Sequence, residues 1–559
     1  MRQAGRYILA AMVAGVLAVF LVWPIARVIR NGFYDGGELT TWWFRQVFTD
    51  PSLREWLVNA ARVAIFTTTL SMVLGVPLAV LADRVEFRGK SLASALLLAP
   101  MILPPFVGAV AFQKLFAAHW GSVNLILERL GLAKVDFFGG ANTFWMVVVL
   151  EALHLYPIIY LNAASALANI DPAMGEAARN LGASRRRVLW RITLPLMRPG
   201  LFAGATIVFI WSFCELGTPL MLNYGGLLPV RIYDGLTDQT TPTQTFAMVF
   251  VMLGASVGLY ATGKLLFGRA AATPVGRANV SVSRRRAGWG GTLGCWAAFA
   301  LVTFVAVLPH IGIVLMAVAD RWSGSILPTS YTWRYLAEVF RDERTWRAIV
   351  NSLRYAGLST VLCAVLALAV SYLVVRLRVR GALLLDSTSM LPLAVPGLVM
   401  AAGYVAITAR GTPLAAIGPH ENPFVLLVIA YTIRRLPYMV RSLSAGLQQI
   451  PETLEEAARN LGSSRFGAVV RVTLPLVTAN ILAGGILAFS FNMLEVSDSL
   501  VLAQREIDYP ITKQLFELAQ GPDQELAAAL GVFGMVLLGG TILAVNGLLG
   551  RRMGQLFRV

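Results

Sequence analysis

The chain has 559 residues, of which 57% are hydrophobic and only 14% are charged, and its mean hydropathy is +0.67. Soluble domains carry about 25% charged residues, so this composition excludes an ordinary soluble protein. The formal net charge of +17 would suit a nucleic-acid-binding protein, but Lys and Arg lie mostly in short segments between apolar runs. We therefore expect a multi-pass membrane protein that is embedded in a lipid bilayer and binds no nucleic acid.

Apolar runs long enough to cross a bilayer recur along the chain and predict an all-α polytopic membrane protein with about twelve transmembrane helices. The predicted spans lie near residues 7–29, 57–83, 92–117, 143–167, 201–221, 244–267, 292–318, 348–374, 384–408, 423–446, 481–503 and 525–549. Lys and Arg number roughly 26 on one set of connecting segments and roughly 16 on the other, and the richer side is expected to face the cytoplasm. Both termini are then cytoplasmic.

The sequence contains an internal repeat. The block Glu176–Arg185 matches Glu456–Arg465 at an offset of 280 residues, and Pro104 matches Pro396 at an offset of 292. We therefore expect two homologous six-helix transmembrane halves, residues 1–268 and 292–559. A cytoplasmic linker at residues 269–291, rich in Gly, Ala, Ser and Arg, is expected to join them.

The repeated block lies between the fourth and fifth predicted spans of each half and is too charged to be inserted in lipid. In the first copy Asp171, which precedes a proline, predicts a helix N-cap. In the second copy Thr453 with Glu456 predicts a capping box. Gly182 and Gly462 are expected to end the two helices in the left-handed conformation. Each copy therefore predicts a short helix, a sharp turn and a second helix on the cytoplasmic face.

Each short helix carries an acid and a base three positions apart, which can meet on one side of the helix. A pair of alanines leaves an adjacent face nearly flat, and such a face suits insertion into a groove on a partner. The alternative is an amphipathic helix lying on the membrane surface, but that would need bulky apolar anchors. The residues predicted to dock are Glu176, Ala177, Ala178, Arg179 and Gly182 in the first copy and Glu456, Ala457, Ala458, Arg459 and Gly462 in the second.

The order Glu-Ala-Ala, then Gly after a short spacer, then Ile/Val-x-Leu-Pro resembles the EAA loop of the inner-membrane permeases of bacterial binding-protein-dependent ABC importers. The resemblance covers nearly the whole chain and implies a location in the bacterial inner membrane. It also implies that Glu176 to about Arg187 and Glu456 to about Ala468 are coupling helices, which dock onto a homodimer of cytoplasmic ATPase subunits. A periplasmic solute-binding protein is the implied second partner, and a small solute is the cargo.

One segment, Arg88–Ser91, has the Gly-Lys-Ser of a phosphate-binding loop, but Arg84 stands where the leading glycine is required. The segment also lies between two predicted membrane helices and follows no strand. We therefore expect a transport subunit that is not an enzyme and has no cofactor of its own, with ATP and Mg²⁺ bound by the partner ATPase subunits.

Ionisable residues within spans are functional candidates because their insertion is costly. Glu215 and Glu495, which the offset of 280 relates, follow the repeated block at the outer end of the next helix. With Asp498, Glu151 and Arg434 they form our candidate translocation pathway. The alternative for the paired acids is that they hold neighbouring helices in register by hydrogen bonds.

Glu151 and His154 lie three apart on the fourth span and could contribute metal ligands. The second half has Tyr431 and Arg434 at the matching positions. We therefore favour a structural hydrogen bond over a metal site, and we assign no metal ligands.

The fusion of both halves in one chain of this length is similar to permeases of ferric-iron importers, with thiamine, polyamine and 2-aminoethylphosphonate systems as neighbours. Glu-Leu-Gly-Thr-Pro from Glu215 and Arg-Arg-Leu-Pro-Tyr from Arg434 resemble the iron and phosphonate group. Ferric iron is the substrate that we expect, and the other three are alternatives.

A proton-coupled secondary carrier that uses Glu215 and Glu495 is the rival from another class, but it leaves the duplicated cytoplasmic motif unexplained. A purely structural membrane scaffold is the third hypothesis.

Overall fold

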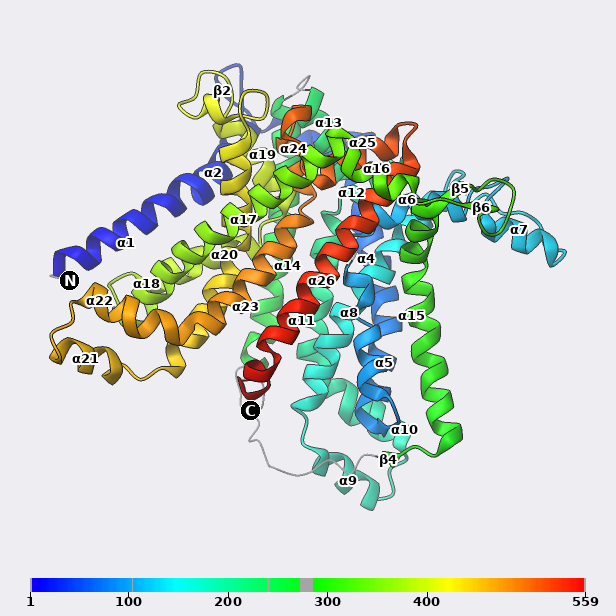
Figure 1. The fold of residues 1–559 in the computed structure, drawn as a ribbon, viewed down its shortest axis with the longest axis horizontal. Coiled ribbons are helices and arrows are strands. Elements are labelled where there is room, and N and C mark those ends of the chain that lie inside the picture. Colours follow the sequence, from blue (N-terminus) through cyan, green and yellow to red (C-terminus); the bar gives the residue numbers. More distant parts are fainter. Residues whose placement is uncertain (1–2, 103, 239–241, 272–284, 557–559) are drawn as a thin grey trace. The chain divides into compact units, whose positions relative to one another are not determined.

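The computed structural model describes residues 3–102, 104–238, 242–271 and 285–556, which are almost entirely helical (Figure 1). This confirms the predicted all-α class. The strands of this part of the chain are only two or three residues long and form three two-stranded sheets. The pairs are β1 (Tyr34–Asp35) with β2 (Glu38–Leu39), antiparallel, β3 (Val85–Glu86) with β4 (Arg285–Arg286), parallel, and β5 (Ala319–Arg321) with β6 (Ser330–Tyr331), antiparallel.

Nine helical segments of the described residues are long and apolar enough to cross a membrane. They are α1 (Gln3–Leu17) with η1 (Ala18–Val22) and α2 (Trp23–Phe33), α4 (Pro51–Arg84), α8 (Asn142–Ala168), α10 (Arg185–Val188) with η3 (Leu189–Thr193) and α11 (Leu194–Phe213), α14 (Pro242–Ala271), α15 (Trp289–Val318), α17 (Glu343–Ser371) with η4 (Tyr372–Arg376), α22 (Arg465–Ala468) with η7 (Val469–Thr473) and α23 (Leu474–Met493), and α26 (Gln524–Leu556).

Two further spans are broken and bent sharply. The first consists of α5 (Lys90–Leu96), η2 (Ala99–Ile102) and α6 (Pro105–Leu115), and the second of α18 (Ala382–Met390), η5 (Leu391–Leu393) and α19 (Gly397–Ile407). Their two arms meet at 88° and 106°. A proline stands at each break because it cannot continue the helix that precedes it.

In the place of the tenth predicted span lies α20 (Phe424–Gln449). This helix carries Arg434 and Arg435 in its middle and is not among the nine apolar segments. With the two bent pairs the described residues contain up to eleven spans by length and composition. The number twelve therefore stays a prediction.

The repeat is also visible in how the helices begin. The Asp50 carboxylate accepts hydrogen bonds from the backbone amides of Ser52 and Leu53 at the start of α4, at 2.9 and 3.0 Å. The Asp342 carboxylate accepts one from the amide of Thr345 at the start of α17, at 3.0 Å. These side chains satisfy amides that have no partner within the first helical turn.

The chain packs into two compact units that we describe separately. Unit 1 comprises Met1–Thr49, Ile232–Leu253 and Leu336–Val559, and unit 2 comprises Asp50–Arg231 and Gly254–Tyr335. In unit 1, α2 packs along α19, and in unit 2, α15 packs along α6. Each unit therefore contains the first long helix of the other sequence repeat.

The predicted halves, 1–268 and 292–559, describe repeats of sequence, and the packed units do not follow their boundary. Most of the predicted linker, residues 272–284, lies outside the described residues.

Shorter elements connect the spans. They are α3 (Trp42–Thr49), α7 (Ser122–Arg129), α9 (Pro172–Asn180), α12 (Gly217–Met221), α13 (Leu228–Asp238), α16 (Arg334–Arg341), η6 (Ala415–Ile417), α21 (Thr453–Asn460), α24 (Ser497–Leu502), η8 (Glu506–Asp508) and α25 (Ile511–Gln520). Tyr404 and Tyr431 are fully buried in unit 1, and Tyr156 and Phe106 are fully buried in unit 2.

Small residues bring the exchanged helices into close contact. A Cβ atom at Gly403 of α19 would lie 2.7 Å from the Cβ of Pro24 and 2.9 Å from its backbone carbon and oxygen. In unit 2, a Cβ atom at Gly108 of α6 would lie 2.9 Å from the Cβ of Pro309. Small residues at such crossings allow the dispersion contacts that hold helices together in lipid. The hydroxyl of Tyr404 adds a hydrogen bond to the carbonyl of Phe20 at 2.9 Å.

We expect Gly403→Ala to destabilise the protein by about 1–3 kcal/mol, because the added methyl group meets backbone atoms that can move only if α2 moves. The matched control is Gly357→Ala on α17, where a Cβ atom would have nothing within 4 Å, and which should be neutral or stabilising. Thermal unfolding of the detergent-purified protein measures both. Equal midpoints for the two variants would show that the α2–α19 contact is not tight.

Candidate functional site

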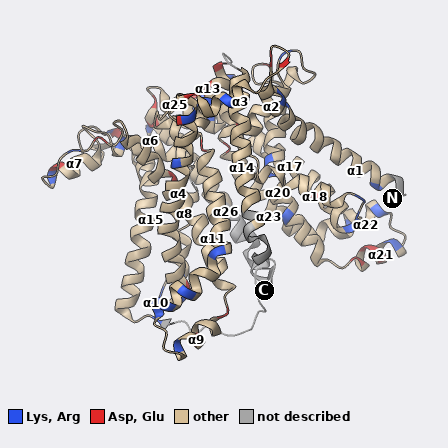
Figure 2. Ribbon diagram, turned by 180° about the vertical axis from the view of Figure 1, so that it is seen from behind, with Lys and Arg blue, Asp and Glu red and all other residues tan. Residues whose placement is uncertain are grey.

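A helix–turn–helix segment projects from the long helices in each unit (Figure 1). In unit 2, α9 is followed by α10, the π-helical turn η3 and α11, and in unit 1, α21 is followed by α22, the π-helical turn η7 and α23. The offset of 280 residues relates α10, η3 and α11 to α22, η7 and α23. We call residues 171–193 and 451–473 the first and second projecting segments. Figure 2 shows basic residues gathered around both of them.

The N-terminus of the first segment is as predicted. The Asp171 side chain accepts a hydrogen bond from the amide of Ala173 at 2.9 Å and so caps α9. The predicted capping box of the second segment is wrong, because Thr453 is already the first residue of α21. The N-cap is Glu452, which has helical backbone angles and makes no side-chain cap. Its carboxylate is instead paired with Arg378 at 3.1 Å.

Both short helices end in the predicted left-handed glycine. Gly182 has φ +85° and Gly462 has φ +88°. The amide of Ala183 donates to the carbonyl of Ala178 at 2.9 Å, and the amide of Ser463 donates to the carbonyl of Ala458 at 3.0 Å. This is the Schellman arrangement, in which a positive φ lets the chain reverse and satisfy the last carbonyls of the helix.

The predicted acid–base pairs form on both helices. Glu176 and Arg179 lie 3.9 Å apart, as do Glu456 and Arg459, and all four side chains are well exposed. The alanines are partly covered at Ala178 and Ala458 and exposed at Ala177 and Ala457. The contacts of these residues with a partner stay a prediction.

One feature that the sequence analysis did not single out is an apolar residue just after each short helix. Leu181 and Leu461 are each 89% exposed. A leucine at this exposure in a charged segment is the kind of anchor that a groove on a partner would cover. Its signal in the sequence was its repetition at the same position of both copies.

Acid and base meet inside unit 1. Glu495, which is 3% exposed, lies 3.0 Å from Nε of Arg434 and also contacts Arg435. Arg435 in addition donates to the carbonyl of Phe491 at 3.1 Å. Two guanidinium groups therefore share one buried carboxylate, which compensates the charge of Glu495 at membrane depth.

Asp498 lies next to this cluster. Its carboxylate is 3.7 Å from Nη1 of Arg434, it is fully buried, and neither of its oxygens has a hydrogen bond within the described residues. The Arg434 guanidinium also lies against Gly397, the first residue of α19, where no side chain would fit. The cluster thus sits at the break of the second bent span.

The acids of unit 2 have different surroundings. Glu151 is 1% exposed and accepts hydrogen bonds from Ser212 and, at 3.4 Å, from Thr67. Glu215 accepts from the amide and the hydroxyl of Thr218 at 3.2 and 3.3 Å. Because Glu215 and Glu495 belong to different units, the structure does not test the common pathway that we predicted for them.

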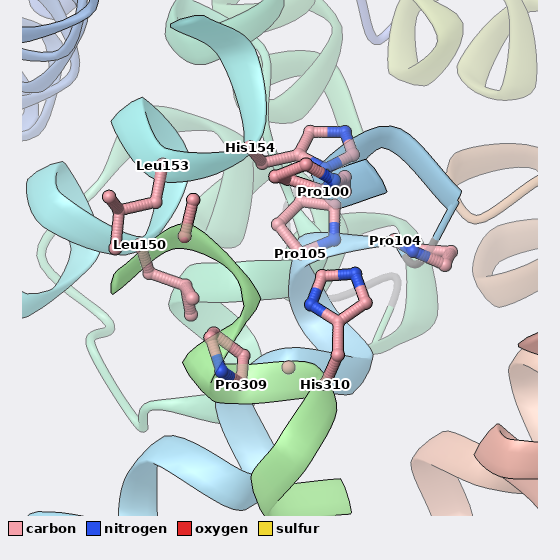
Figure 3. A pocket seen from close by; sticks show the side chains of 10 residues that line it. Pro100, Pro104, Pro105, Leu150, Leu153, His154, Pro309 and His310 are labelled. Atoms are coloured by element: carbon pink, nitrogen blue, oxygen red, sulfur yellow. The ribbon is translucent and has the colours of Figure 1, made fainter. Parts of the chain in front are cut away.

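His154 is turned toward the first bent span rather than toward Glu151. Its Nδ1 donates to the carbonyl of Pro100 at 2.9 Å. His154 and His310 line a cavity of about 10 Å³ with Pro100, Pro104, Pro105 and Pro309 (Figure 3). That volume is about the room for one water molecule. The described residues contain no group of three His, Cys, Asp or Glu side chains placed to hold a metal.

A much larger cavity, of about 830 Å³, lies in unit 1. Its polar lining includes Asp238, Arg410, His420 and Glu421, none of which the sequence analysis selected. They lie outside the apolar runs, in connecting segments without a repeated pattern. Val501 of α24 also lines this cavity, and Asp498 lies three residues earlier on the same short helix. The charged cluster and the cavity are therefore about one helical turn apart along α24.

The described residues thus form a polytopic helical membrane protein from which two charged helices project. The family model described as "Binding-protein-dependent transport system inner membrane component" matches residues 75–324 and 364–555. The chain belongs to this family, and it is the permease subunit of an ABC importer.

Several curated relatives are similar to the chain. The ferric transport system permease protein FbpB of Actinobacillus pleuropneumoniae is 23% identical, over 98% of this chain and 79% of its own. The Fe(3+)-transport system permease protein FbpB 2 of Haemophilus influenzae is 22% identical, over 82% of this chain and 83% of its own. The spermidine/putrescine transport system permease protein PotC of Haemophilus influenzae is 25% identical, over 47% of this chain and 97% of its own. Among solved structures, a bacterial ABC transporter involved in the import of alginate matches with a TM-score of 0.38 and 19% identity, over 47% of this chain and 96% of that chain.

We expect Glu495→Gln to lower the free energy of unfolding by about 3–5 kcal/mol, because two largely buried guanidinium groups lose their shared negative charge. The matched control is Asp498→Asn, which neutralises an adjacent buried carboxylate that accepts no hydrogen bond and should cost less than about 1 kcal/mol. Thermal unfolding in detergent ranks the two variants. A loss for Asp498→Asn as large as that for Glu495→Gln would contradict the central position of Glu495 in the cluster.

Proposed function

We propose that this permease imports ferric iron and is driven by a homodimer of cytoplasmic ATPase subunits, which bind its two projecting segments. In this proposal both termini and both segments face the cytoplasm of a bacterial cell, and a periplasmic binding protein delivers the solute from the other side. ATP and Mg²⁺ belong to the ATPase subunits, and the permease carries out no covalent chemistry.

The observation that carries the coupling part of the proposal is the duplicated projecting segment. Both copies present an exposed Glu–Arg pair, an exposed alanine and a leucine that is 89% exposed. In both copies a four-residue turn, 181–184 or 461–464, leads from this surface to a second short helix, and a π-helical turn continues that helix directly into a long helix. A displacement of the short helix by a partner is therefore passed on to a membrane helix.

The proposed work of the permease is alternating access between two packings of similar free energy. Partners can shift such an equilibrium only by binding the two packings with different affinity. ATP-driven closure of the ATPase dimer would move α9 and α21, and through them α11 and α23. The bent spans are suited to such motion because their helices are already interrupted.

Ferric iron as the cargo is supported by the relatives that match across both repeats. The two FbpB proteins cover most of this chain, whereas PotC covers 47% of it. A cation on the proposed route would pass from the large cavity of unit 1 along α24 toward Asp498 and Glu495, and Glu151, Glu215 and Arg434 complete the proposed pathway. Carboxylates are ligands that hard cations prefer.

The coupling proposal predicts that Glu456→Lys abolishes co-purification of the ATPase subunits, because it reverses an exposed charge in the centre of the docking surface. Glu343→Lys is the matched control. Glu343 is 82% exposed and pairs with Arg347 at the opposite end of α17 from the second projecting segment. This variant should retain the ATPase subunits.

Pull-down of tagged permease from membranes that contain both subunits measures this association. Unchanged recovery of the ATPase with Glu456→Lys would count heavily against docking at α21. A wild-type permease that transports its solute in liposomes without any ATPase would instead favour the proton-coupled carrier. The absence of any solute flux in the complete complex would favour a structural scaffold.

The cargo proposal predicts uptake of radiolabelled ferric iron by proteoliposomes that contain the permease, its ATPase and its binding protein. Uptake should stop when ATP or the binding protein is omitted. Thiamine, putrescine and 2-aminoethylphosphonate, each tested with the same complex, should not accumulate. Iron uptake that persists without the binding protein, or accumulation of one of the other three solutes in place of iron, would overturn the assignment.

A further inference from the structure

The second projecting segment contains a buried acid, Glu455, which is 9% exposed. Its carboxylate accepts hydrogen bonds from the hydroxyl of Tyr372 at 2.9 Å and from that of Thr473 at 2.7 Å. It also lies 3.4 Å from Nε of Arg376, whose side chain is 6% exposed. Tyr372 and Arg376 belong to η4 at the end of α17, and Thr473 is the last residue of η7. One side chain of α21 thus binds two different membrane helices.

Arg376 strengthens this connection by reaching past Glu455. Its Nη2 donates to the carbonyl of Ile450 at 2.7 Å, and its Nη1 lies 3.8 Å from Glu452. The residues just before α21 and within it are therefore fixed to the same arginine. Hydrogen bonds to charged groups are among the stronger ones in proteins, and a buried pair resists separation because either partner alone would be uncompensated.

The first projecting segment has the corresponding arginine and threonine but lacks the acid. Arg84 and Thr193 stand at the positions of Arg376 and Thr473, and the guanidinium of Arg84 donates to the hydroxyl of Thr193 at 3.1 Å. At the position of Glu455, however, stands Gly175. In the described part of the chain no carboxylate is paired with Arg84, and α9 has no buried residue at all.

The helices that receive the two segments also differ. The end of α4 at Arg84 is regular α-helix, whereas α17 ends in the π-helical turn Tyr372–Arg376. A π-turn inserts an extra residue into the helical spiral and so changes which side chains lie on one face. Here it presents Tyr372 and Arg376 together to Glu455.

We propose that Glu455 is a positioning residue that locks the second projecting segment to α17 and α23, whereas among the described residues no buried side chain of α9 fixes the first segment in this way. The two docking sites for the ATPase dimer are then mechanically unequal. Movement of α21 is passed on to two membrane helices at once. In contrast, α9 can shift a short way relative to α11 before α11 moves with it. The mechanical consequence rests on the proposed coupling to ATPase subunits, but the anchoring itself does not.

Hydrogen–deuterium exchange of the full-length permease alone, in detergent, tests the anchoring. Amides of α21 should exchange at least about tenfold more slowly than those of α9 after correction for intrinsic rates, since one hydrogen bond to a charged group stabilises by about 1.5–3 kcal/mol. Glu455→Gln and Tyr372→Phe should speed the exchange of α21. Glu343→Gln is the matched control, because it makes the same change of charge at an exposed position at the far end of α17 and should leave the exchange of α21 as in the wild type.

The reciprocal variant is Gly175→Glu. A Cβ atom there would meet only Val188, at 3.6 Å, so the position has room for a side chain. The new carboxylate is expected to reach Arg84 and to slow the exchange of α9 several-fold. Equal exchange of α9 and α21 in the wild type, or unchanged exchange of α21 in Glu455→Gln, would overturn the proposal, as would unchanged exchange of α9 in Gly175→Glu.

A second measurement separates this proposal from the coupling proposal. In the reconstituted complex, Glu455→Gln should retain the ATPase subunits but transport several-fold less solute per ATP hydrolysed. If the wild-type permease does not bind the ATPase subunits, the proposed coupling is wrong, but the anchoring measured by hydrogen–deuterium exchange is unaffected. If Glu455→Gln transports as much solute per ATP hydrolysed as the wild type, the positioning role is wrong and the proposed coupling is unaffected.

Discussion

Hydrocarbon offers no hydrogen-bond partner, so backbone and side-chain polar groups cannot face lipid without a partner within the protein. Much of the structure follows from this constraint. Glu495 lies between two arginines, and Glu151 accepts hydrogen bonds from two hydroxyl groups. Only beyond the apolar part of the helices can charges stay exposed, as the Glu–Arg pairs of α9 and α21 do. The same constraint therefore separates the exposed surface that we propose for partner binding from the buried groups of the membrane helices.

The bent spans obey this constraint as well. A helix broken at a proline leaves backbone carbonyls without an amide, and such groups are tolerated in a membrane only where protein satisfies them. In unit 2, the hydroxyl of Tyr156 donates to the carbonyl of Leu97 at 2.9 Å, and His154 donates to that of Pro100 at the same distance. Side chains of the neighbouring helix α8 thus replace the lost hydrogen bonds.

The two repeats share the same order of helices but carry different charged side chains at equivalent positions. The offset that relates Glu215 to Glu495 also relates His154 to Arg434 and Thr218 to Asp498. Unit 1 consequently holds a cluster of carboxylates and arginines, whereas in unit 2 Glu151 and Glu215 accept hydrogen bonds from hydroxyl groups. The same inequality appears at the projecting segments, where Gly175 corresponds to Glu455. On the proposed function, a partner with twofold symmetry would therefore act on two halves that respond differently, although it would dock on corresponding helices, α9 and α21.

Sequence by itself determined the class of the fold, the repeat and the local shape of the projecting segments. Apolar runs, an N-cap at Asp171 and a glycine after each short helix depend only on near neighbours in the chain, so pattern reasoning could find them. The capping box at Thr453 does not form, because α21 begins one residue earlier than predicted, and the preceding Glu452 is paired with Arg378, 74 residues away along the chain. Contacts of this range decided the rest: the exchange of α2 and α15 between the units, the cluster around Glu495, and the anchoring of α21 by Glu455. Composition and spacing carry no information about which distant side chains meet, since that depends on how whole helices pack.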